Sequence, residues 1–400
     1  MSSTSVFALK DQGPIYLMGL GHGATHWIAG IFYIVLPLLR DDLGLSYTQA
    51  GLLVSILHVS SFVANFGSGA LVDITGRKVA LQIASLVVGA LALAVFGLTG
   101  IYLILCLMVA LIGATNNLWH PPAIAFISSR YPKHRGYALS IHATGASIGD
   151  MIAPLAAGAV LAELGWRTTA LYSTAPVFVV VGIFVFVLLP RDGASERGSG
   201  SKMDFAEYFR GLGAMVRHRP TVGLCLLAAF RSMAQNGLLL FLPLYLMDVL
   251  KTSPVVMGTA LMAMHLAGAV VSPIAGTVSD RIGRRPVVMA GLGASTVTIF
   301  ALTFAPTASI YIVGVSVLGF VLYAVRPVVH SWLMDISPAG MQGSASSLLF
   351  GTQSLLSIAM PALGGMVADA YGLVEVFYLI AAMMLLANVM CVLLPAPQKS

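Results

Sequence analysis

The sequence predicts an all-α membrane protein, with twelve transmembrane helices in two pseudo-symmetric six-helix bundles and both termini in the cytoplasm. Its composition is the first reason: 58% of the 400 residues are hydrophobic and only 9% are charged, whereas soluble domains average roughly 25% charged residues. A chain with so few charged side chains cannot face water on all sides, so we expect lipid to surround it. The other two reasons are the length of its apolar runs and an internal repeat.

Twelve apolar runs are each long enough to cross a bilayer, which takes about 20 residues. The first six lie at roughly 14–38, 47–72, 79–98, 101–128, 136–162 and 166–189. The second six lie at roughly 220–248, 254–278, 286–305, 308–334, 342–369 and 372–394. The expected domains are an N-terminal bundle over 1–190 and a C-terminal bundle over 220–400. A polar cytoplasmic linker over 191–219 joins them, and it is expected to hold a short amphipathic helix near 203–216.

The basic residues indicate how the chain is oriented. Of 21 Lys and Arg residues, 16 lie in the termini and in the loops after the second, fourth, sixth and eighth runs. Only Arg40, Arg167 and Lys251 lie in the opposite loops. Because basic loops are retained in the cytoplasm, both termini are expected there. Topology thus accounts for the net charge of +6, and no nucleic-acid partner is expected.

The two sets of runs repeat each other at an offset of 207 residues. The offset aligns identical residues along the whole half: Asp41 with Asp248, Gly51 with Gly258, His58 with His265, Asp73 with Asp280, Pro154 with Pro361, and Gly158 with Gly365. Duplicated halves of this kind are typical of transporters that bind their cargo where the halves meet. The repeat therefore predicts a carrier.

Both halves carry a glycine-containing basic loop after their second helix, "GALVDITGRK" over 69–78 and "GTVSDRIGRR" over 276–285. The glycines allow a tight turn, and an acid at a helix end can pair with the following arginines or cap a neighbouring helix. These loops resemble the signature G-x-L-A-D-R-x-G-R-K of the major facilitator superfamily. The resemblance covers all twelve helices and implies a monomeric carrier of that fold, which works by alternating access. The residues expected to form its cytoplasmic gate are Asp73, Gly76, Arg77, Asp280, Gly283 and Arg284.

Two further stretches resemble exporters of that superfamily. "GDMIAPLAAG" over 149–158 resembles the fifth-helix motif G-x-x-x-G-P-x-x-G-G of drug and proton antiporters, with Ala153 and Ala157 in place of glycine. "NNLWHPPAIAF" over 116–126 resembles the fosmidomycin-resistance type, which has a His-Pro at this place. These resemblances imply export, although the fourth helix lacks the arginine that drug and proton antiporters carry before a glycine.

One carboxyl group is expected at the middle of the membrane. Ionisable groups at this depth cost at least ~2.5–3.5 kcal/mol and are functional by default. Asp150 lies about 20 Å into the fifth helix at 1.5 Å per residue, and no other acid lies in the middle of a run. A buried carboxyl group without a charged partner keeps its proton until water or a cation reaches it. Asp150 is therefore expected to couple transport to protons, with His58 and His265 as candidate partners. A static ion pair with Arg231 is the alternative.

Polar side chains share one face of the seventh helix and one face of the tenth: Arg231 with Gln235, and Arg326 with Tyr323 and His330. Arginine stays charged, and its planar fork matches carboxylate or phosphonate groups. Two arginines against one central acid leave a surplus of positive charge, which favours an anionic cargo. The alternative is that Arg326 pairs with Asp335 or extends its long side chain to the cytoplasmic face.

Seven histidines lie within the apolar runs, and His22 and His26 stand one helical turn apart. Zinc metalloproteases use this spacing in H-E-x-x-H, whose glutamate is the general base. Gly23 replaces the glutamate here, so neither an intramembrane hydrolase nor another enzyme is expected. The two histidines are expected to line the cargo pathway, with no resident metal. The whole expected substrate site is His22, His26, Asn117, His120, Arg231, Gln235, Tyr323 and Arg326.

The sequence thus predicts a proton-coupled secondary transporter of the bacterial inner membrane that moves a small organic anion or an amphiphilic, drug-like compound, with export favoured. No phosphate-binding loop of the G-x-x-x-x-G-K-[ST] kind is present, so ATP is not expected to drive it, and no cofactor is expected. Two alternatives stay open: uptake of a small organic acid with protons, and a divalent-metal carrier that uses the intramembrane histidines.

Overall fold

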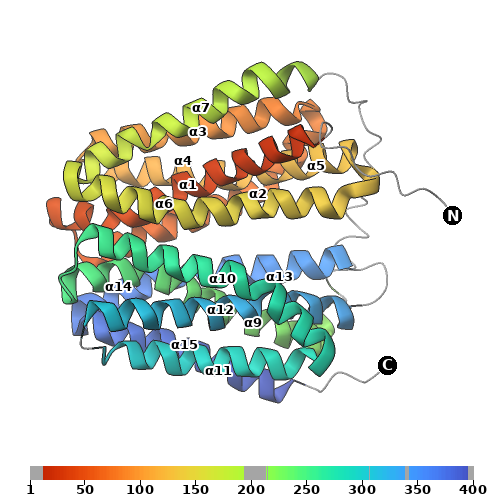
Figure 1. The fold of residues 1–400 in the computed structure, drawn as a ribbon. Helices are drawn as coiled ribbons and strands as arrows, with labels where there is room; N and C mark the ends of the chain where they lie inside the picture. Colours follow the sequence, from red (N-terminus) through yellow and green to blue (C-terminus); the bar gives the residue numbers. More distant parts are fainter. Residues whose placement is uncertain (1–11, 193–212, 214, 306, 338–341, 395–400) are drawn as a thin grey trace. The chain divides into compact units, whose positions relative to one another are not determined.

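The computed structural model describes residues 12–192, 213, 215–305, 307–337 and 342–394, which are helical and contain no β-strand (Figure 1). The helices of the first half are α1 (Gly13–Asp42), α2 (Tyr47–Thr75), α3 (Lys78–Leu98), α4 (Tyr102–Leu118), α5 (His120–Arg130), α6 (Arg135–Tyr172) and α7 (Thr174–Ile183). Those of the second half are α9 (Arg219–Leu244), α10 (Pro254–Ile282), α11 (Arg284–Leu302), α12 (Ala308–Ile336), α13 (Gln342–Ser357), α14 (Ala359–Tyr371) and α15 (Leu373–Leu393).

Eleven of the described segments are long and apolar enough to cross a membrane. One of them, Pro132–Leu188, has 57 residues and contains Gly165 at φ 70° and ψ 173°, outside the helical region. Glycine tolerates this conformation, so the segment divides there into two spans. The described residues therefore hold twelve spans, and the predicted all-α membrane class is confirmed.

Two further sequence predictions concern the orientation of the termini and a helix in the linker. The orientation of the termini stays a prediction, which rests on the distribution of basic residues. The helix expected near 203–216 lies almost entirely outside the described residues, of which it includes only 213, 215 and 216.

The chain divides into two compact units, which are described separately. Unit 1 comprises Met1–Phe32, Ser60–Ala153 and Leu164–Gly200, and unit 2 comprises Tyr33–Val59, Pro154–Glu163 and Ser201–Ser400. The division passes through α1, α2 and α6, so unit 2 includes one end of α1, the beginning of α2 and a ten-residue piece of α6.

Within unit 1, glycines bring α1 and α6 into backbone contact. A Cβ atom added to Gly23 would lie 2.9 Å from the carbonyl oxygen of Gly145, and one added to Gly149 would overlap the backbone of Gly23. Small residues at such spacing allow close helix packing in membranes. The contact places the polar side chains of these two helices side by side.

Within unit 2, the 207-residue repeat reappears as a pair of matching contacts. A Cβ atom on Gly51 would overlap the carbonyl oxygen of Pro361, and one on Gly258 would overlap that of Pro154. Likewise, Gly365 faces the backbone of Tyr47, and Gly158 faces that of Pro254. In each half, the repeat-related glycines thus allow two helix backbones to approach closely.

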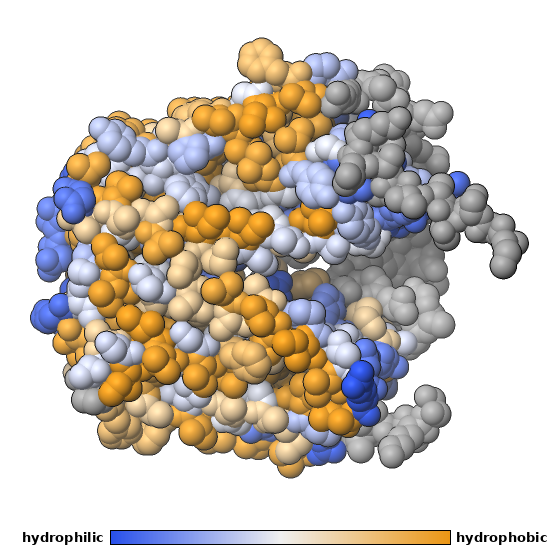
Figure 2. All heavy atoms as spheres, in the orientation of Figure 1, coloured by the Kyte–Doolittle hydropathy of each residue, from blue (hydrophilic) through white to orange (hydrophobic). Residues whose placement is uncertain are grey.

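The outer surfaces suit a lipid environment. Figure 2 shows apolar side chains over much of the visible face of the helices, with hydrophilic side chains gathered toward the helix ends. Large apolar residues are well exposed, for example Leu103 at 68% and Val297 at 68%. Extended apolar surface of this kind marks contact with a membrane or another apolar partner.

Candidate functional site

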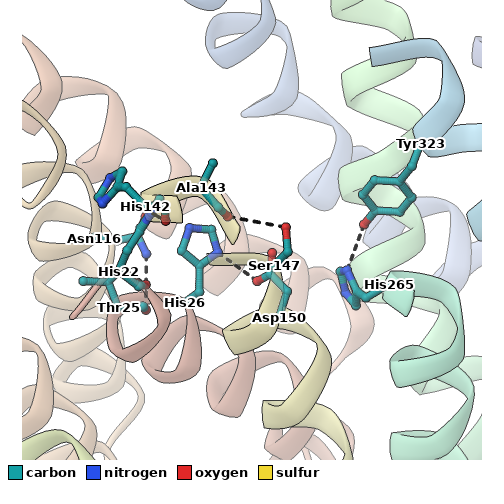
Figure 3. A network of polar contacts seen from close by, with 10 residues as sticks. All are labelled: His22, Thr25, His26, Asn116, His142, Ala143, Ser147, Asp150, His265 and Tyr323. Carbon is teal, nitrogen blue, oxygen red and sulfur yellow. Dashed lines mark hydrogen bonds and ion pairs between the residues drawn. The ribbon is translucent and has the colours of Figure 1, made fainter. Parts of the chain in front are cut away.

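A histidine and the central carboxyl group meet in unit 1. Nδ1 of His26 in α1 lies 2.8 Å from Oδ1 of Asp150 in α6 (Figure 3), and the two side chains are 26% and 36% exposed. The glycine contact between α1 and α6 allows this approach, because it leaves no Cβ atoms between the helices. The structure therefore gives Asp150 a partner in its own unit, one that the sequence had placed at the same depth without pairing the two.

His26 of this pair belongs to a cluster of four histidine rings. Nδ1 of His22 lies 2.8 Å from the carbonyl oxygen of His142, and the rings of these two residues stack with centroids 4.0 Å apart. The rings of His26 and His120 stand edge-on to His22, at 4.8 Å and 4.9 Å. His142, which the expected substrate site did not include, thus completes the cluster.

The cluster has the composition of a metal site, although it was not predicted as one. One ligand atom from each of His22, His26 and His120 lies within 4.8 Å of the others, and Nε2 of His22 is buried without a hydrogen-bond partner among the described residues. Imidazole nitrogens suit zinc, copper and nickel. The three histidines could therefore hold a transition-metal ion, and a functional test has to include one.

The neighbouring residues Asn116 and Asn117 of α4 differ in their hydrogen bonding. Nδ2 of Asn116 donates to the carbonyl oxygen of Thr25 at 3.3 Å, which fixes α4 to α1. Asn117, the predicted substrate residue, is half-buried and makes no hydrogen bond to the described residues. Asn117 keeps its amide for another partner.

The repeat-related histidines each meet a tyrosine in unit 2. Nε2 of His58 lies 3.4 Å from the hydroxyl group of Tyr33, and Nδ1 of His265 lies 3.1 Å from that of Tyr323. The hydroxyl group of Tyr323, a residue expected to bind substrate beside Arg326, contacts His265. The two histidines thus share a type of partner, which the alignment of the halves does not predict.

The most deeply buried charge of the described chain is a guanidinium group in α9. Arg231 is 2% exposed; its Nη1 donates to Oε1 of Gln235 at 2.8 Å, and its Nη2 lies 3.5 Å from Oγ of Ser232. Both partners are neutral, so the charge is held in position without being compensated. The pairing of Arg231 with Gln235 on one face of the helix is as the spacing predicts.

Arg231 opens onto a small cavity between α9, α12 and α13. The cavity is open to solvent and leaves about 250 Å³ free of atoms, solvent-filled space included. Its polar lining is Arg231, Arg326, His330 and Gln353. Its apolar lining is Val329, Leu349 and Phe350. None of the described residues that line the cavity is acidic, so its two arginines leave a surplus of positive charge. His330 and Gln353 belong to this site, although the predicted set omits them.

The gate motif of the second half forms a bridge between α10 and α12. Arg284 contacts Asp280, and its Nε donates to Oδ2 of Asp335 at 3.0 Å. Gly283, at φ 96°, makes the turn that begins α11. Because Asp335 pairs with Arg284, and no hydrogen bond joins it to Arg326 in the described chain, the alternative partner proposed for Arg326 is not supported.

For the copy of this motif in the first half, the structure describes the turn and the beginning of α3. Gly76 adopts φ 63° in the turn, and Arg77 is exposed at the beginning of α3. The side chain of Asp73 lies outside the described part of the structure. The N-terminus of α3 is capped by a residue that the motif does not contain: Asp192 accepts hydrogen bonds from the backbone N–H groups of Val79 and Ala80.

A second polar cluster in unit 2 was not predicted. Oδ2 of Asp248 accepts from Nη2 of Arg40 at 2.8 Å and from the hydroxyl group of Tyr47 at 2.9 Å. Asp369 accepts from the backbone N–H groups of Tyr47 and Thr48, at 2.8 and 2.9 Å, and so caps α2. The sequence contained one signal, the alignment of Asp41 with Asp248, but Arg40 was counted only as a loop charge.

Twelve membrane spans, an internal repeat and buried polar side chains define a class of protein, the secondary transporters. The chain belongs to the Major Facilitator Superfamily, whose family model matches residues 18–271 and 224–400. It is accordingly a multi-pass membrane transporter, not an enzyme.

Three relatives are similar over most of their length. The multidrug resistance protein MdtG of Klebsiella pneumoniae (strain 342) is 25% identical over 359 residues, which cover 88% of this chain and 85% of the relative. The hexuronate transporter of Bacillus subtilis (strain 168) is 25% identical, covering 93% and 92%. The fosmidomycin resistance protein of Escherichia coli (strain K12) is 23% identical, covering 98% and 95%, so the predicted resemblance to that type is confirmed as a distant one.

Solved structures show the same fold. A bacterial homolog of the human lysosomal transporter Spinster, in an inward-facing and occupied conformation, aligns with a TM-score of 0.82 at 18% identity, over 95% of this chain and 96% of that one. The nucleoside transporter NupG aligns with a TM-score of 0.80 at 12% identity, over 95% and 99%. At such identities the likeness concerns the fold alone, which confirms the predicted major facilitator architecture.

Proposed function

We propose that this transporter exports a small organic anion, or an amphiphilic compound with an anionic group, across the bacterial inner membrane in exchange for protons. One observation carries the anionic part: Arg231 and Arg326 line the same cavity, and its lining within the described part of the chain contains no acidic side chain. A buried charge without compensation is costly. An anion that enters the cavity removes that cost, whereas a cation would add to it.

The proposed proton site is Asp150, with His26 as its hydrogen-bond partner and with His58 and His265 as further coupling residues. The short contact between His26 and Asp150 supports this role, because a carboxyl group and an imidazole can share and release a proton as water reaches them. Both side chains keep about a quarter to a third of their surface exposed. A proton can therefore enter and leave this pair without unfolding of the helices.

The remaining polar side chains are proposed to contact the cargo or to form the gate. Cargo is proposed to contact Gln235 and Arg326 beside Arg231, with His22, Asn117, His120 and Tyr323 further along the pathway. The cytoplasmic gate is proposed to consist of Asp73, Gly76, Arg77, Asp280, Gly283 and Arg284. The direction rests on the relatives, because two of those described above are named for resistance. The third is named a hexuronate transporter, and uptake of a small organic acid with protons is the competing possibility.

A thermal-shift screen of the purified, detergent-solubilised protein tests the proposal. The panel holds organic acids, phosphonates, lipophilic cations and divalent ions, and each is tested on the wild type, on Arg231→Ala and on Arg281→Gln. Arg281 is an exposed arginine at the end of α10, so the third protein controls for a general loss of charge. A ligand at 100 times its Kd stabilises the folded state by about 2.7 kcal/mol.

We expect anions to raise the Tm of the wild type and of Arg281→Gln but not that of Arg231→Ala. Stabilisation by divalent ions alone, abolished by His22→Ala or His120→Ala, would replace the proposal by a metal carrier built on the histidine cluster. Stabilisation by lipophilic cations, indifferent to Arg231, would also overturn it.

A further inference from the structure

The lining of the cavity beside Arg231 bears on more than the sign of the charge of the transported compound. Resting on the proposed function, we infer that the cavity selects organic anions that carry two negative charges on a compact apolar body, as phosphonates and dicarboxylates do. Arg326 and Phe350 are inferred to determine that selectivity, Arg326 for charge and Phe350 for the apolar body.

Two arginines of the cavity lining account for the preference for two negative charges. An arginine side chain cannot lose its proton in a protein, so Arg231 and Arg326 contribute two fixed positive charges to the lining of one cavity. Asp335, the acid closest to Arg326 in the same helix, is engaged by Arg284. A singly charged ligand would leave one of the two charges uncompensated, whereas a doubly charged ligand neutralises both.

Free hydrogen-bond donors support the same conclusion. Arg231 offers five N–H donors, and its contacts in the described structure are those with Gln235 and Ser232. These contacts hold the plane of the guanidinium group while other N–H groups stay available. Arg326 and Gln353 make no hydrogen bond to the described residues, so their N–H groups are available to an oxyanion in the cavity. Arginine forks bind carboxylates and phosphoryl groups by paired hydrogen bonds.

The rest of the lining is apolar and partly aromatic. Val329 and Leu349 are buried, whereas Phe350 is 42% exposed and meets the ring of His330 edge-on with centroids 5.1 Å apart. The contact with His330 restrains the orientation of the Phe350 ring. An aryl or short alkyl group attached to the oxyanion can therefore pack on Phe350, and this contact distinguishes such a ligand from an inorganic anion.

Four matched probes separate charge from apolar body in titration calorimetry on the purified full chain. Phenylphosphonate carries both features, benzoate has one charge, benzyl alcohol has none, and methylphosphonate lacks the ring. At a pH at which phosphonates are doubly ionised, we expect phenylphosphonate to bind at least about tenfold more tightly than benzoate, which corresponds to ~1.4 kcal/mol. Methylphosphonate is expected to bind more weakly than phenylphosphonate, and benzyl alcohol more weakly than benzoate.

Variants assign the two features to their residues. Arg326→Gln is expected to bind benzoate nearly as well as the wild type but to lose the preference for phenylphosphonate, whereas Arg326→Lys keeps that preference because the charge remains. Phe350→Ala is expected to reduce the difference between phenylphosphonate and methylphosphonate and to leave the preference for two charges intact. Arg281→Gln is the control, with all four affinities unchanged.

The outcomes separate this inference from the proposed function. Equal binding of phenylphosphonate and benzoate, unaffected by Arg326→Gln, would overturn the selectivity while leaving anion transport in place. Failure of every anion to bind to a folded wild-type protein would overturn both. If Arg326→Gln does not fold, the comparison of Arg326→Lys with the wild type and the four wild-type affinities still decide the question.

Discussion

Nδ1 of His26 and Oδ1 of Asp150 lie 2.8 Å apart and join α1 to α6 across 124 residues of sequence. The pair lies where two helix backbones touch through glycines, and it unites a carboxyl group at membrane depth with a cluster of histidines. This relationship converts a candidate proton site, which the sequence placed only by depth, into a defined hydrogen bond.

The pair allows structure and function to be tested separately. Asp150→Asn keeps a carbonyl oxygen that can accept from His26 but cannot exchange a proton, whereas Asp150→Leu loses both. We expect Asp150→Asn to keep a Tm near that of the wild type and Asp150→Leu to lower it, because the lost partner leaves a polar ring without its hydrogen bond. Thermal unfolding of both variants measures this difference. A Tm for Asp150→Asn as low as that for Asp150→Leu would show that the charge, and not the hydrogen bond, holds the helices.

How much the sequence could predict depends on the type of information. The fold followed from the length of the apolar runs and from the repeat, because a bilayer fixes the length of a helix that spans it. Depth along each helix also followed, and it placed His26 and Asp150 at one level. The rotation of each helix about its axis did not follow, because it depends on packing against neighbours. Partners such as His22 with His142, or Tyr323 with His265, were therefore out of reach.

The site residues that the sequence missed are instructive for the same reason. Gln353 lines the cavity of Arg231, but in the sequence it is an ordinary polar residue of an apolar run. His330 also lines the cavity; the sequence places it on one face with Arg326 but does not assign it to the substrate site. The repeat was more informative about packing, because the aligned residues Gly51 and Gly258 make equivalent contacts. A repeat reports on packing that both halves need, whereas a binding site uses side chains that one half alone supplies.

The contact of Arg40 with Asp248 is expected to stabilise unit 2. Both side chains are largely buried, at 17% and 19% exposure, and Arg40 also lies over the ring of Tyr47, 4.2 Å from its centroid. Arg40→Gln should cost about 1.5–3 kcal/mol, the range for hydrogen bonds to charged groups. Thermal unfolding of Arg40→Gln, Asp248→Asn and the double variant measures the coupling.

Lys251→Gln is the matched control for this pair. Lys251 is an exposed cation in the same loop region as Asp248, so its removal changes the net charge by the same amount without breaking a contact. An additive double variant, or an equal effect of Lys251→Gln, would show that the pair of Arg40 and Asp248 contributes nothing specific.

Two glycines of α10 provide a test of the repeat-related contacts. Gly258→Ala forces a Cβ atom into the carbonyl oxygen of Pro154, whereas a Cβ atom on Gly276 meets nothing within 4 Å. We expect Gly258→Ala to cost about 1–3 kcal/mol through overpacking, and Gly276→Ala to stabilise by up to ~1 kcal/mol through helix propensity. Gly51→Ala should behave like Gly258→Ala. Equal Tm values for the two variants of α10 would refute the interpretation of the repeat as a packing device.

The bridge formed by Arg284 is expected to depend on the shape of its side chain. Its Nε and Nη1 atoms bond to different partners, Asp335 and Ser279, which a lysine ammonium group cannot reproduce in the same geometry. Arg284→Lys should therefore slow transport in proteoliposomes nearly as much as Arg284→Gln. Arg281→Gln, at an exposed position on the same helix end, should leave the rate unchanged. Full activity of Arg284→Lys would mean that charge alone matters at this position.

The central claim is that movement of an organic anion is coupled to protons through Asp150. The most direct measurement follows the internal pH of proteoliposomes that contain phenylphosphonate inside and none outside, with wild type, Asp150→Asn and Arg231→Ala compared. The account predicts acidification of the interior with the wild type, and none with either variant. It also predicts that Asp150→Asn still exchanges labelled phenylphosphonate across the membrane. Acidification by Asp150→Asn at the wild-type rate, or release of the anion by the wild type without any change in pH, would contradict the account.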